Sequence, residues 1–501
     1  MALGSRAKIP ENQYSRSNVA ASVRSGARLV TASQASLQVV RLLVAVVLAR
    51  LLDPGDFGLV AMAYVVVNFL DIFKDLGTKA AVVQRQTVTR EFASSVFVVN
   101  VALGAGLTLL IVAVAPLVAT VYGEPDVRPV LQVLGVVIGV SSWGLVHQAY
   151  LHRRMQFGRL ALLHIAIAAT NAAVSLTLAF AGWGVWALVL GALSGSVVAN
   201  VLAWSLSGLR LVPHFSRQDL REIRKFSLNL SGSQMVGFTI SNADKFIIGR
   251  WLGATALGHY NIAQRILLYP VRAITQMLQE VLFPAMSRIQ DDDAALGRGY
   301  LRALSGIALL IFPAMTGIAV TASPFVLGVL GSKWEPAIPV IVIIASVGAL
   351  KSLLHTTSLL YVVKARTDWL LRWTLVAGGL SVASYVVGLP FGIVGVATAY
   401  AGVQVLLFYP AFAIPFRLIG LPFSALLRAL LPYAISSMVM GAAVLVLRRA
   451  LELLGVGHLP VLIASVGAGV TVYLVMVIVW RASAVRELIL LVKRPRREVT
   501  P

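Results

Sequence analysis

Residues 48–63 read LARLLDPGDFGLVAMA, and residues 248–263, two hundred positions later, read IGRWLGATALGHYNIA. Four residues of the first copy return at the same places in the second, as Arg50/Arg250, Leu52/Leu252, Gly58/Gly258 and Ala63/Ala263. Each copy joins apolar segments through a turn that carries an arginine and glycines. The duplication predicts that the chain is built from two matching halves.

The composition decides the class of protein. Apolar residues make up 58% of the 501 residues and charged residues 12%, whereas soluble domains are roughly 45–50% apolar. Apolar runs of about 20 residues recur along the chain, and each is long enough for a helix to cross a ~30 Å hydrocarbon core. They do not alternate apolar and polar residues as barrel strands do. We therefore expect an all-α polytopic membrane protein.

Glycine, proline and charged residues divide these runs into about 14 transmembrane helices. The expected spans are 26–49, 57–81, 92–120, 128–150, 160–181, 184–208, 227–249, 256–283, 301–322, 336–362, 369–388, 393–416, 427–447 and 459–480.

The basic residues lie mostly in alternate loops, as they do on the cytoplasmic side of membrane proteins. With the N-terminus inside, nearly all the arginine-rich loops become cytoplasmic, and so does the C-terminal tail. The net charge of +22 then follows from topology and from attraction to an anionic inner leaflet. We expect a multi-pass protein with both termini cytoplasmic, and no nucleic acid among its partners.

The repeat also predicts the domain organisation. About six spans separate its two copies, and because six is even, both copies face the same side of the membrane. Such a parallel repeat predicts two six-helix bundles around a central cavity, with two C-terminal helices in addition. The expected segments are a cytoplasmic segment 1–25, an N-terminal bundle 26–209, a cytoplasmic linker 210–226, a C-terminal bundle 227–416, two additional helices 417–482 and a basic cytoplasmic tail 483–501.

Several charged residues remain at membrane depth. Each costs at least ~2.5–3.5 kcal/mol at a lipid-facing helix centre, so we expect them to face the protein interior or a watery cavity. Asp71, Lys74 and Asp75 share one helix face and either pair with one another or act in function. The adjacent Asp244 and Lys245 are either a gating or ion-coupling pair or a local charge match.

The sequence lacks the motifs that mark nucleotide-binding and zinc-dependent sites. The connections are short, and no G-x-x-x-x-G-K-[ST] or H-E-x-x-H run occurs, which disfavours ATP-driven transport and zinc catalysis. The chain has no cysteine, so disulfides and thiolate metal sites are excluded. We interpret the acidic run 291–293 as a solvated turn. We expect no catalytic residue, no metal and no cofactor.

One family resemblance emerges from three stretches. LARLLDPGDFGLVAMAYVVVNFLDIFKDLGTKAAVVQR (48–85) and NADKFIIGRWLGATALGHYNIAQRI (242–266) resemble elements of the polysaccharide transporters of the MOP flippase superfamily, and GWGVWALVLG (182–191) is also in place. The resemblance implies a flippase that moves a lipid-linked oligosaccharide, typically on undecaprenyl diphosphate, across the bacterial inner membrane. It implies O-antigen, capsule or exopolysaccharide assembly, with membrane lipids, a polysaccharide polymerase and export machinery as further partners.

A diphosphate–sugar head group is large and anionic, so such a flippase needs a wide basic cavity. The substrate-binding candidates are the basic and polar residues expected to line it: Arg41, Lys74, Arg265, Arg272, Lys351, Gln34, Gln38, Tyr269 and Gln276. The candidates for ion coupling or gating are Asp71, Asp75, Asp244, Lys245 and Glu280. Whether H⁺ or Na⁺ drives the transport is left open.

Two other functions compete with this interpretation. A MATE-like ion-coupled multidrug antiporter is the first, but it calls for an acid-dominated interior, and basic residues outnumber acidic ones at membrane depth. A membrane-embedded glycan polymerase or ligase is the second, and the short outer loops oppose it.

Overall fold

The computed structural model describes residues 37–38, 40–75, 82, 88–212, 214–216, 235, 237–267 and 286–479. Within these residues the regular secondary structure is helical and no strand occurs, as the sequence predicts. The chain divides into two compact units, residues 1–258 (unit 1) and 259–501 (unit 2). The predicted linker 210–226 lies largely outside the described residues, so the predicted division into bundles stays a prediction.

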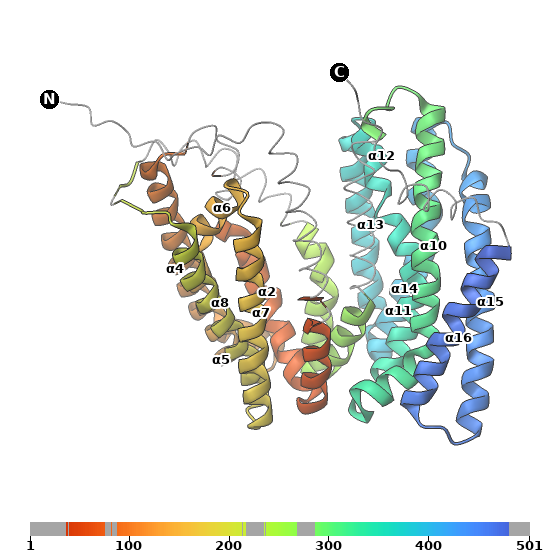
Figure 1. The fold of residues 1–501 in the computed structure, drawn as a ribbon, viewed down its shortest axis with the longest axis horizontal. Helices are drawn as coiled ribbons and strands as arrows, with labels where there is room; N and C mark the ends of the chain where they lie inside the picture. The colour runs from red at the N-terminus through yellow and green to blue at the C-terminus, as the bar shows by residue number, and fades with distance from the viewer. Residues whose placement is uncertain are drawn as a thin grey trace. The chain divides into compact units, whose positions relative to one another are not determined.

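Unit 1 is a bundle of long helices that run roughly side by side (Figure 1). Its helices are α2 (Pro54–Asp75), α4 (Arg90–Tyr122), α5 (Val127–Ser142), α6 (Leu145–Arg153), α7 (Phe157–Phe180) and α8 (Val185–Ser207). Helical residues 40–51 and 237–258 also belong to it. α5 is the central helix, because it packs against α2, α4 and α8.

Unit 2 is a second helical bundle, which begins with helical residues 259–267. Its further helices are α10 (Asp293–Phe325), α11 (Ala337–Leu354), α12 (Thr357–Val363), α13 (Thr367–Gly388), α14 (Gly392–Phe416), α15 (Phe423–Leu453) and α16 (His458–Val479). Short helical turns connect them at Val326–Leu330, Ser332–Trp334, Leu389–Phe391 and Arg417–Ile419. α14 packs against both α11 and α13, and α10 packs against α11, α15 and α16.

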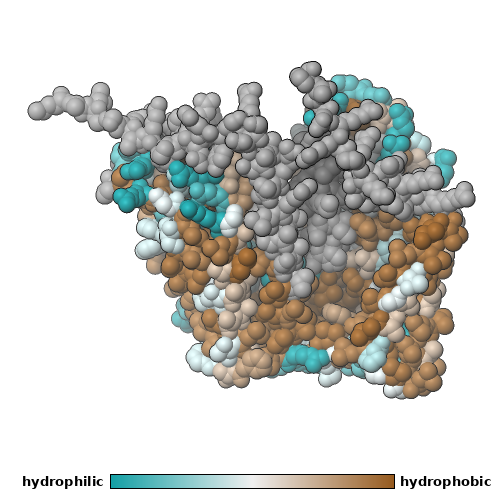
Figure 2. Space-filling view, viewed as in Figure 1, coloured by the Kyte–Doolittle hydropathy of each residue, from teal (hydrophilic) through white to brown (hydrophobic). Residues whose placement is uncertain are grey.

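The outer surfaces of the helices are apolar, as a membrane requires. Leu109 and Leu406 are 70% and 75% exposed, and Figure 2 shows apolar side chains along the helices and hydrophilic ones near their ends. Nine helical segments of the described residues are long and apolar enough to cross a membrane, and α5 with α6, bent by 44°, adds a further candidate. The chain is therefore a multi-pass membrane protein. Parts of five expected spans lie outside the described residues, so the total of about 14 stays a prediction.

The backbone of unit 1 recurs in unit 2. The bent pair α5–α6 corresponds to α11–α12, and each pair ends at a non-glycine residue with positive φ, Met155 (54°) and Ala365 (53°). In both places the next residue donates its N–H to the carbonyl group five positions earlier, from Gln156 to Leu151 (3.1 Å) and from Arg366 to Tyr361 (2.7 Å). The two pairs of helices thus end in the same backbone turn.

The two duplicated turns pack against each other within unit 1. A Cβ atom on Gly58 would overlap the carbonyl group of Ala254, and a Cβ atom on Gly258 would overlap that of Pro54. Pro54 and Ala254 are themselves two hundred positions apart, so each copy of the repeat makes the same contact with the other. Both glycines are therefore required by the close approach of the two turns.

Glu124, in the loop between α4 and α5, stabilises this contact with a hydrogen bond. Its Oε1 accepts the backbone N–H of Ala254 at 3.1 Å. Ala254 directly follows Gly253, whose φ is +84°, and a carboxylate stabilises a backbone N–H group at such a change of direction.

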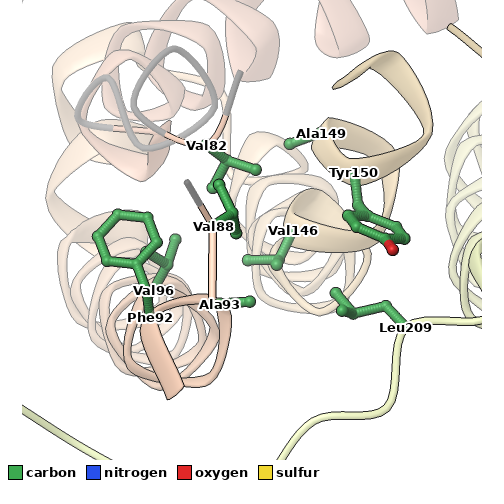
Figure 3. Packing of buried hydrophobic residues seen from close by; sticks show 9 residues of the cluster. All are labelled: Val82, Val88, Phe92, Ala93, Val96, Val146, Ala149, Tyr150 and Leu209. Atoms are coloured by element: carbon green, nitrogen blue, oxygen red, sulfur yellow. The ribbon is translucent and has the colours of Figure 1, made fainter. Parts of the chain in front are cut away.

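A buried apolar cluster closes the end of unit 1 at which α4 begins (Figure 3). Its side chains come from α4, α6 and the segments before α4 and after α8: Val82, Val88, Phe92, Ala93, Val96, Val146, Ala149, Tyr150 and Leu209. The Oγ atoms of Ser94 and Ser95 accept the backbone N–H groups of Val212 and Ser216, at 2.8 and 3.1 Å. The segment after α8 is thereby fixed to the start of α4.

The glycine contact makes a direct prediction about stability. Gly58→Ala and Gly258→Ala should each lower the free energy of unfolding by about 1–3 kcal/mol, because the added methyl group has no space. Gly106→Ala in α4 is the matched control, since nothing lies within 4 Å of its Cβ position and alanine favours a helix by up to ~1 kcal/mol. Thermal denaturation of the protein in detergent measures the difference. Equal melting temperatures for the control and the two contact variants would contradict the packing argument.

Candidate functional site

Lys74 in α2 is held by two partners in unit 1. Its Nζ lies 2.6 Å from Asp71 Oδ1, one helical turn away, and donates to Ser141 Oγ of α5 at 3.0 Å. The side chain of Lys74 is 13% exposed and that of Asp71 is 45% exposed. The predicted pairing of these two residues is confirmed. The side chain of Asp75 lies outside the described residues.

The surroundings of Lys74 allow its ammonium group to remain charged. A partly buried ammonium group needs a partner to remain charged, and Asp71 and Ser141 provide partners in this structure. Asp71 is nearly half exposed. Lys74 thus joins a partly exposed carboxylate of its own helix to a serine of α5.

Asp244 and Lys245 make contacts that are local to their own helix. Asp244 is only 3% exposed, and its Oδ1 accepts the backbone N–H of Lys245 at 2.8 Å. Lys245 Nζ donates to Asn242 Oδ1 at 2.9 Å. These bonds fit the interpretation as a local charge match, and a gating or coupling role stays a prediction.

Arg41 and Gln38 lie near the start of the described part of unit 1. The side chain of Arg41 is exposed and that of Gln38 is half-buried. The Nε2 atom of Gln38 is buried and has no hydrogen-bond partner in this structure. Gln34, which shares their predicted helix face, lies outside the described residues.

A polar and aromatic cluster surrounds Lys351 in unit 2. Lys351 Nζ lies 5.2 Å from the ring centroid of Tyr400 in α14. The Tyr400 ring stacks on Tyr385 of α13, with 5.4 Å between centroids and 25° between planes. One turn further along α14, Gln404 Nε2 donates to Ser381 Oγ at 3.3 Å.

This cluster is largely buried except at its lysine. Lys351 is half-buried, whereas Tyr385, Tyr400, Ser381 and Gln404 are all nearly inaccessible. A cation above an aromatic ring is stabilised by the ring's quadrupole, and Lys351 Nζ lies over the Tyr400 ring. Three helices, α11, α13 and α14, position the group.

The sequence identified Lys351 but missed the four residues around it. A usable signal existed, because Tyr400 and Gln404 stand at i and i+4 within the expected span 393–416 and so share one helix face. The pairing with α13 is a tertiary contact and has no such signal.

Of the other predicted site residues, the structure describes only one. Arg265 is exposed on helical residues 259–267 of unit 2. The remaining candidates fall outside the described residues: Tyr269, Arg272, Gln276 and Glu280.

The polysaccharide biosynthesis protein family matches residues 47–339, and the chain belongs to this family. The lipopolysaccharide biosynthesis protein WzxC of Escherichia coli K12 is 27% identical over 367 residues, which cover 72% of this chain and 74% of WzxC. The succinoglycan biosynthesis transport protein ExoT of Rhizobium meliloti is 29% identical over 301 residues, 60% of each chain. The teichuronic acid biosynthesis protein TuaB of Bacillus subtilis is 25% identical over 362 residues, which cover 70% of this chain and 73% of TuaB.

Solved structures agree on the fold. The lipid II flippase MurJ in an inward closed conformation superposes with a TM-score of 0.69 at 14% identity, covering 90% of this chain and 99% of MurJ. An inward-facing multidrug resistance MATE transporter of the MOP superfamily gives a TM-score of 0.65 at 15% identity, covering 77% and 94%. The chain thus has the MOP fold, and the family resemblance inferred from the sequence is confirmed.

The unequal exposure of the Asp71–Lys74 pair predicts an asymmetric effect of mutation. Asp71→Asn should lower the stability by about 1 kcal/mol, because the largely buried ammonium group of Lys74 loses its counter-charge. Lys74→Met should cost less, about 0.5 kcal/mol, because the carboxylate left behind is well solvated. Thermal denaturation of both variants provides the comparison. A Lys74→Met variant that is the less stable of the two would contradict this account of the pair.

Proposed function

We propose that the chain is a flippase that moves a lipid-linked oligosaccharide, carried on undecaprenyl diphosphate, across the bacterial inner membrane. Membership of the polysaccharide biosynthesis family supports the proposal. The observation that carries it is the presence of a lysine on a membrane-length helix of each unit, Lys74 beside Ser141 in unit 1 and Lys351 over the Tyr400 ring in unit 2. The flipped glycan would serve O-antigen, capsule or exopolysaccharide assembly.

The names of the relatives narrow the substrate class. WzxC, ExoT and TuaB are named for lipopolysaccharide, succinoglycan and teichuronic acid, three chemically different polymers. Because proteins of one family serve three different polymers, the substrate should be a feature that their assembly can share. A glycan attached to a lipid carrier is such a feature. The constant part of that substrate is the anionic diphosphate and its lipid.

Such a flippase must bind its substrate but does not convert it chemically. A diphosphate at membrane depth needs cations, because an unpaired charge there is costly. Lys74, Lys351, Arg41 and Arg265, with Arg272 beyond the described residues, would supply them. The glycan–lipid crosses unchanged, so no catalytic residue and no cofactor is required, and a polymerase and export machinery would use the product on the outer side. Asp71 and Asp244 are the candidates for coupling to H⁺ or Na⁺.

Alternating access gives the duplicated turn a role. Such a carrier opens at its two ends in turn, and one end must be closed by a contact that can separate. The reciprocal contact of Gly58 and Gly258 in unit 1, beside Glu124, is suited to this, since it joins the two copies of the duplicated turn. With both termini cytoplasmic, the contact lies at the outer end.

A multidrug antiporter is the second candidate, because a MATE transporter shares the fold. Fold alone does not distinguish the two functions. A drug cation would be repelled by Lys351 and Lys74, whereas an anionic head group would be attracted by them. The charge at membrane depth therefore favours the glycan–lipid.

Reconstitution tests the proposal. Liposomes containing the protein should translocate a fluorescent lipid-linked oligosaccharide, and Arg41→Ala, Arg272→Ala and Lys74→Met should each lower the rate about tenfold, the effect of losing ~1.4 kcal/mol. Arg428→Gln, which removes an exposed charge of α15, should leave the rate unchanged. Normal rates in all three variants would rule out the basic cavity. Efflux of a cationic dye, with no glycan–lipid movement by the wild type, would identify a drug antiporter.

A disulfide crosslink tests whether the contact between the two duplicated turns must separate during transport. A Cβ atom on Gly55 would lie 3.5 Å from Thr255 Oγ1, and the natural chain has no cysteine, so Gly55→Cys/Thr255→Cys introduces the only thiol pair. Oxidation should stop translocation and a reductant should restore it. The translocation rate of each single variant should not change with either treatment. If the fully crosslinked protein translocated as fast as the same protein after reduction, the contact would not need to open during transport.

A further inference from the structure

Helix α10 of unit 2 contains two prolines, Pro313 and Pro324. Proline has no backbone N–H group and its ring presses on the carbonyl group four residues earlier, so that carbonyl group loses its partner within the helix. In α10 the two freed carbonyl groups belong to Leu309 and Val320. An unpartnered backbone carbonyl group is costly inside a membrane, so a donor from outside the helix is needed.

Each freed carbonyl group accepts a hydrogen bond from a side chain of one of the last two helices. The hydroxyl group of Tyr473 in α16 donates to the carbonyl oxygen of Leu309 at 2.8 Å. Nη1 of Arg448 in α15 donates to the carbonyl oxygen of Val320 at 2.7 Å. The two side chains thus take the places of the two backbone N–H groups that the prolines lack.

A proline in a helix does not by itself bring such a donor. Pro116 in α4 and Pro410 in α14 free the carbonyl groups of Val112 and Leu406 in the same way. Among the residues that the structure describes, no side chain of another helix donates a hydrogen bond to either of these groups. The two bonds to α10 are therefore a specific feature of its contact with α15 and α16.

Arg448 is oriented for this contact by its own helix. Its Nε lies 3.3 Å from Oε1 of Glu452, one helical turn further along α15, and its side chain is 17% exposed. In the predicted topology α15 ends at the outer face of the membrane, where arginine is less frequent than on the cytoplasmic side. The bond to Val320 gives a physical reason for an arginine at this place.

The apolar contacts of α15 and α16 centre on the same part of α10. A buried apolar cluster joins α15 to α16, and the side chains of Leu309 and Val320 pack against it. Its members are Met440, Val444, Tyr473 and Val477. The two helices pack mainly against α10 and against each other (Figure 1). They are thus attached to unit 2 chiefly through α10, where its prolines interrupt the backbone hydrogen bonds.

We propose that α15 and α16 form a brace for α10, which fixes the course of this helix at its two prolines. Each proline is a place at which a helix can bend, because the hydrogen bond across it is missing. Tyr473 and Arg448 restore a bond to each freed carbonyl group from outside and so remove this freedom. They are positioning residues, and the brace is a conformational device of unit 2.

The braced part of α10 also supports α11, the helix that carries Lys351. A Cβ atom on Gly348 of α11 would lie 2.9 Å from Sδ of Met315 in α10. The two helices are therefore closely packed just after Pro313 and one helical turn before Lys351. Through α10, the brace sets the surface against which a predicted binding residue is held.

A double-mutant cycle tests the brace in the full-length protein in detergent. Arg448→Met and Tyr473→Phe each leave one carbonyl group of α10 without a donor and should lower the melting temperature by about 2–4 °C. In Pro324→Ala the new backbone N–H group bonds to the carbonyl group of Val320. Arg448→Met should therefore lower the melting temperature of that variant by about half as much or less.

A crossed combination and a neighbouring arginine are the controls. Arg448→Met should have its full effect in the Pro313→Ala protein, because Pro313 frees a different carbonyl group. Arg449→Met removes the exposed arginine next to Arg448 and should leave the melting temperature unchanged. Equal losses from Arg448→Met in the wild type and in Pro324→Ala would show that Arg448 does not replace the missing N–H group.

Distance measurements test the shape of α10 separately from its stability. The chain has no cysteine, so Ala294→Cys and Ser332→Cys, two exposed positions near opposite ends of α10, carry the only spin labels. Double electron–electron resonance should give a narrow distance distribution, and adding Arg448→Met and Tyr473→Phe should broaden it about twofold, because both prolines become free to bend.

Removing the prolines is the matched control for this measurement. Adding Pro313→Ala and Pro324→Ala to the broadened variant should narrow the distribution again, because a continuous helix needs no brace. An unchanged width after the loss of both donors would refute the brace. Neither the melting temperatures nor the distances involve a substrate, so the outcome does not depend on the proposed function.

Discussion

The hydrocarbon core of the membrane is the constraint from which the rest of this structure follows. No water is present there to bond free backbone groups, so the chain must satisfy them internally and does so as helices. Between apolar helices there is little hydrophobic driving force, and specificity comes from close approach and from polar contacts. The Gly58–Gly258 contact is the first kind and the Lys74–Asp71–Ser141 group is the second.

Small residues and charges therefore do different work in the same bundle. At Gly58 and Gly258 the absence of a side chain lets two helix starts meet through their backbones, which fixes the position of the repeat but binds nothing. At Lys74 and Lys351 the side chain reaches a partner on another helix, which keeps a charge where lipid would expel it. The first determines how the helices fit, and the second determines what the protein can hold.

The sequence predicted those features that depend on local spacing. The described helices agree with the expected spans to within several residues, since length and apolarity alone delimit them, and the Asp71–Lys74 pair was visible at i, i+3. The partners of Lys351 were not visible, because Tyr400 and Tyr385 come from helices about 35 to 50 residues further along the chain. Only packing brings them together, and no periodicity encodes it. Ser141 was missed for the same reason.

The same backbone turn occurs twice in this chain with different side chains. The turn after α6 and the turn after α12 share φ values and hydrogen bonds although their residues, Met155 and Ala365, have nothing in common. A backbone constraint of this kind admits many side chains, whereas a charge in the membrane admits few.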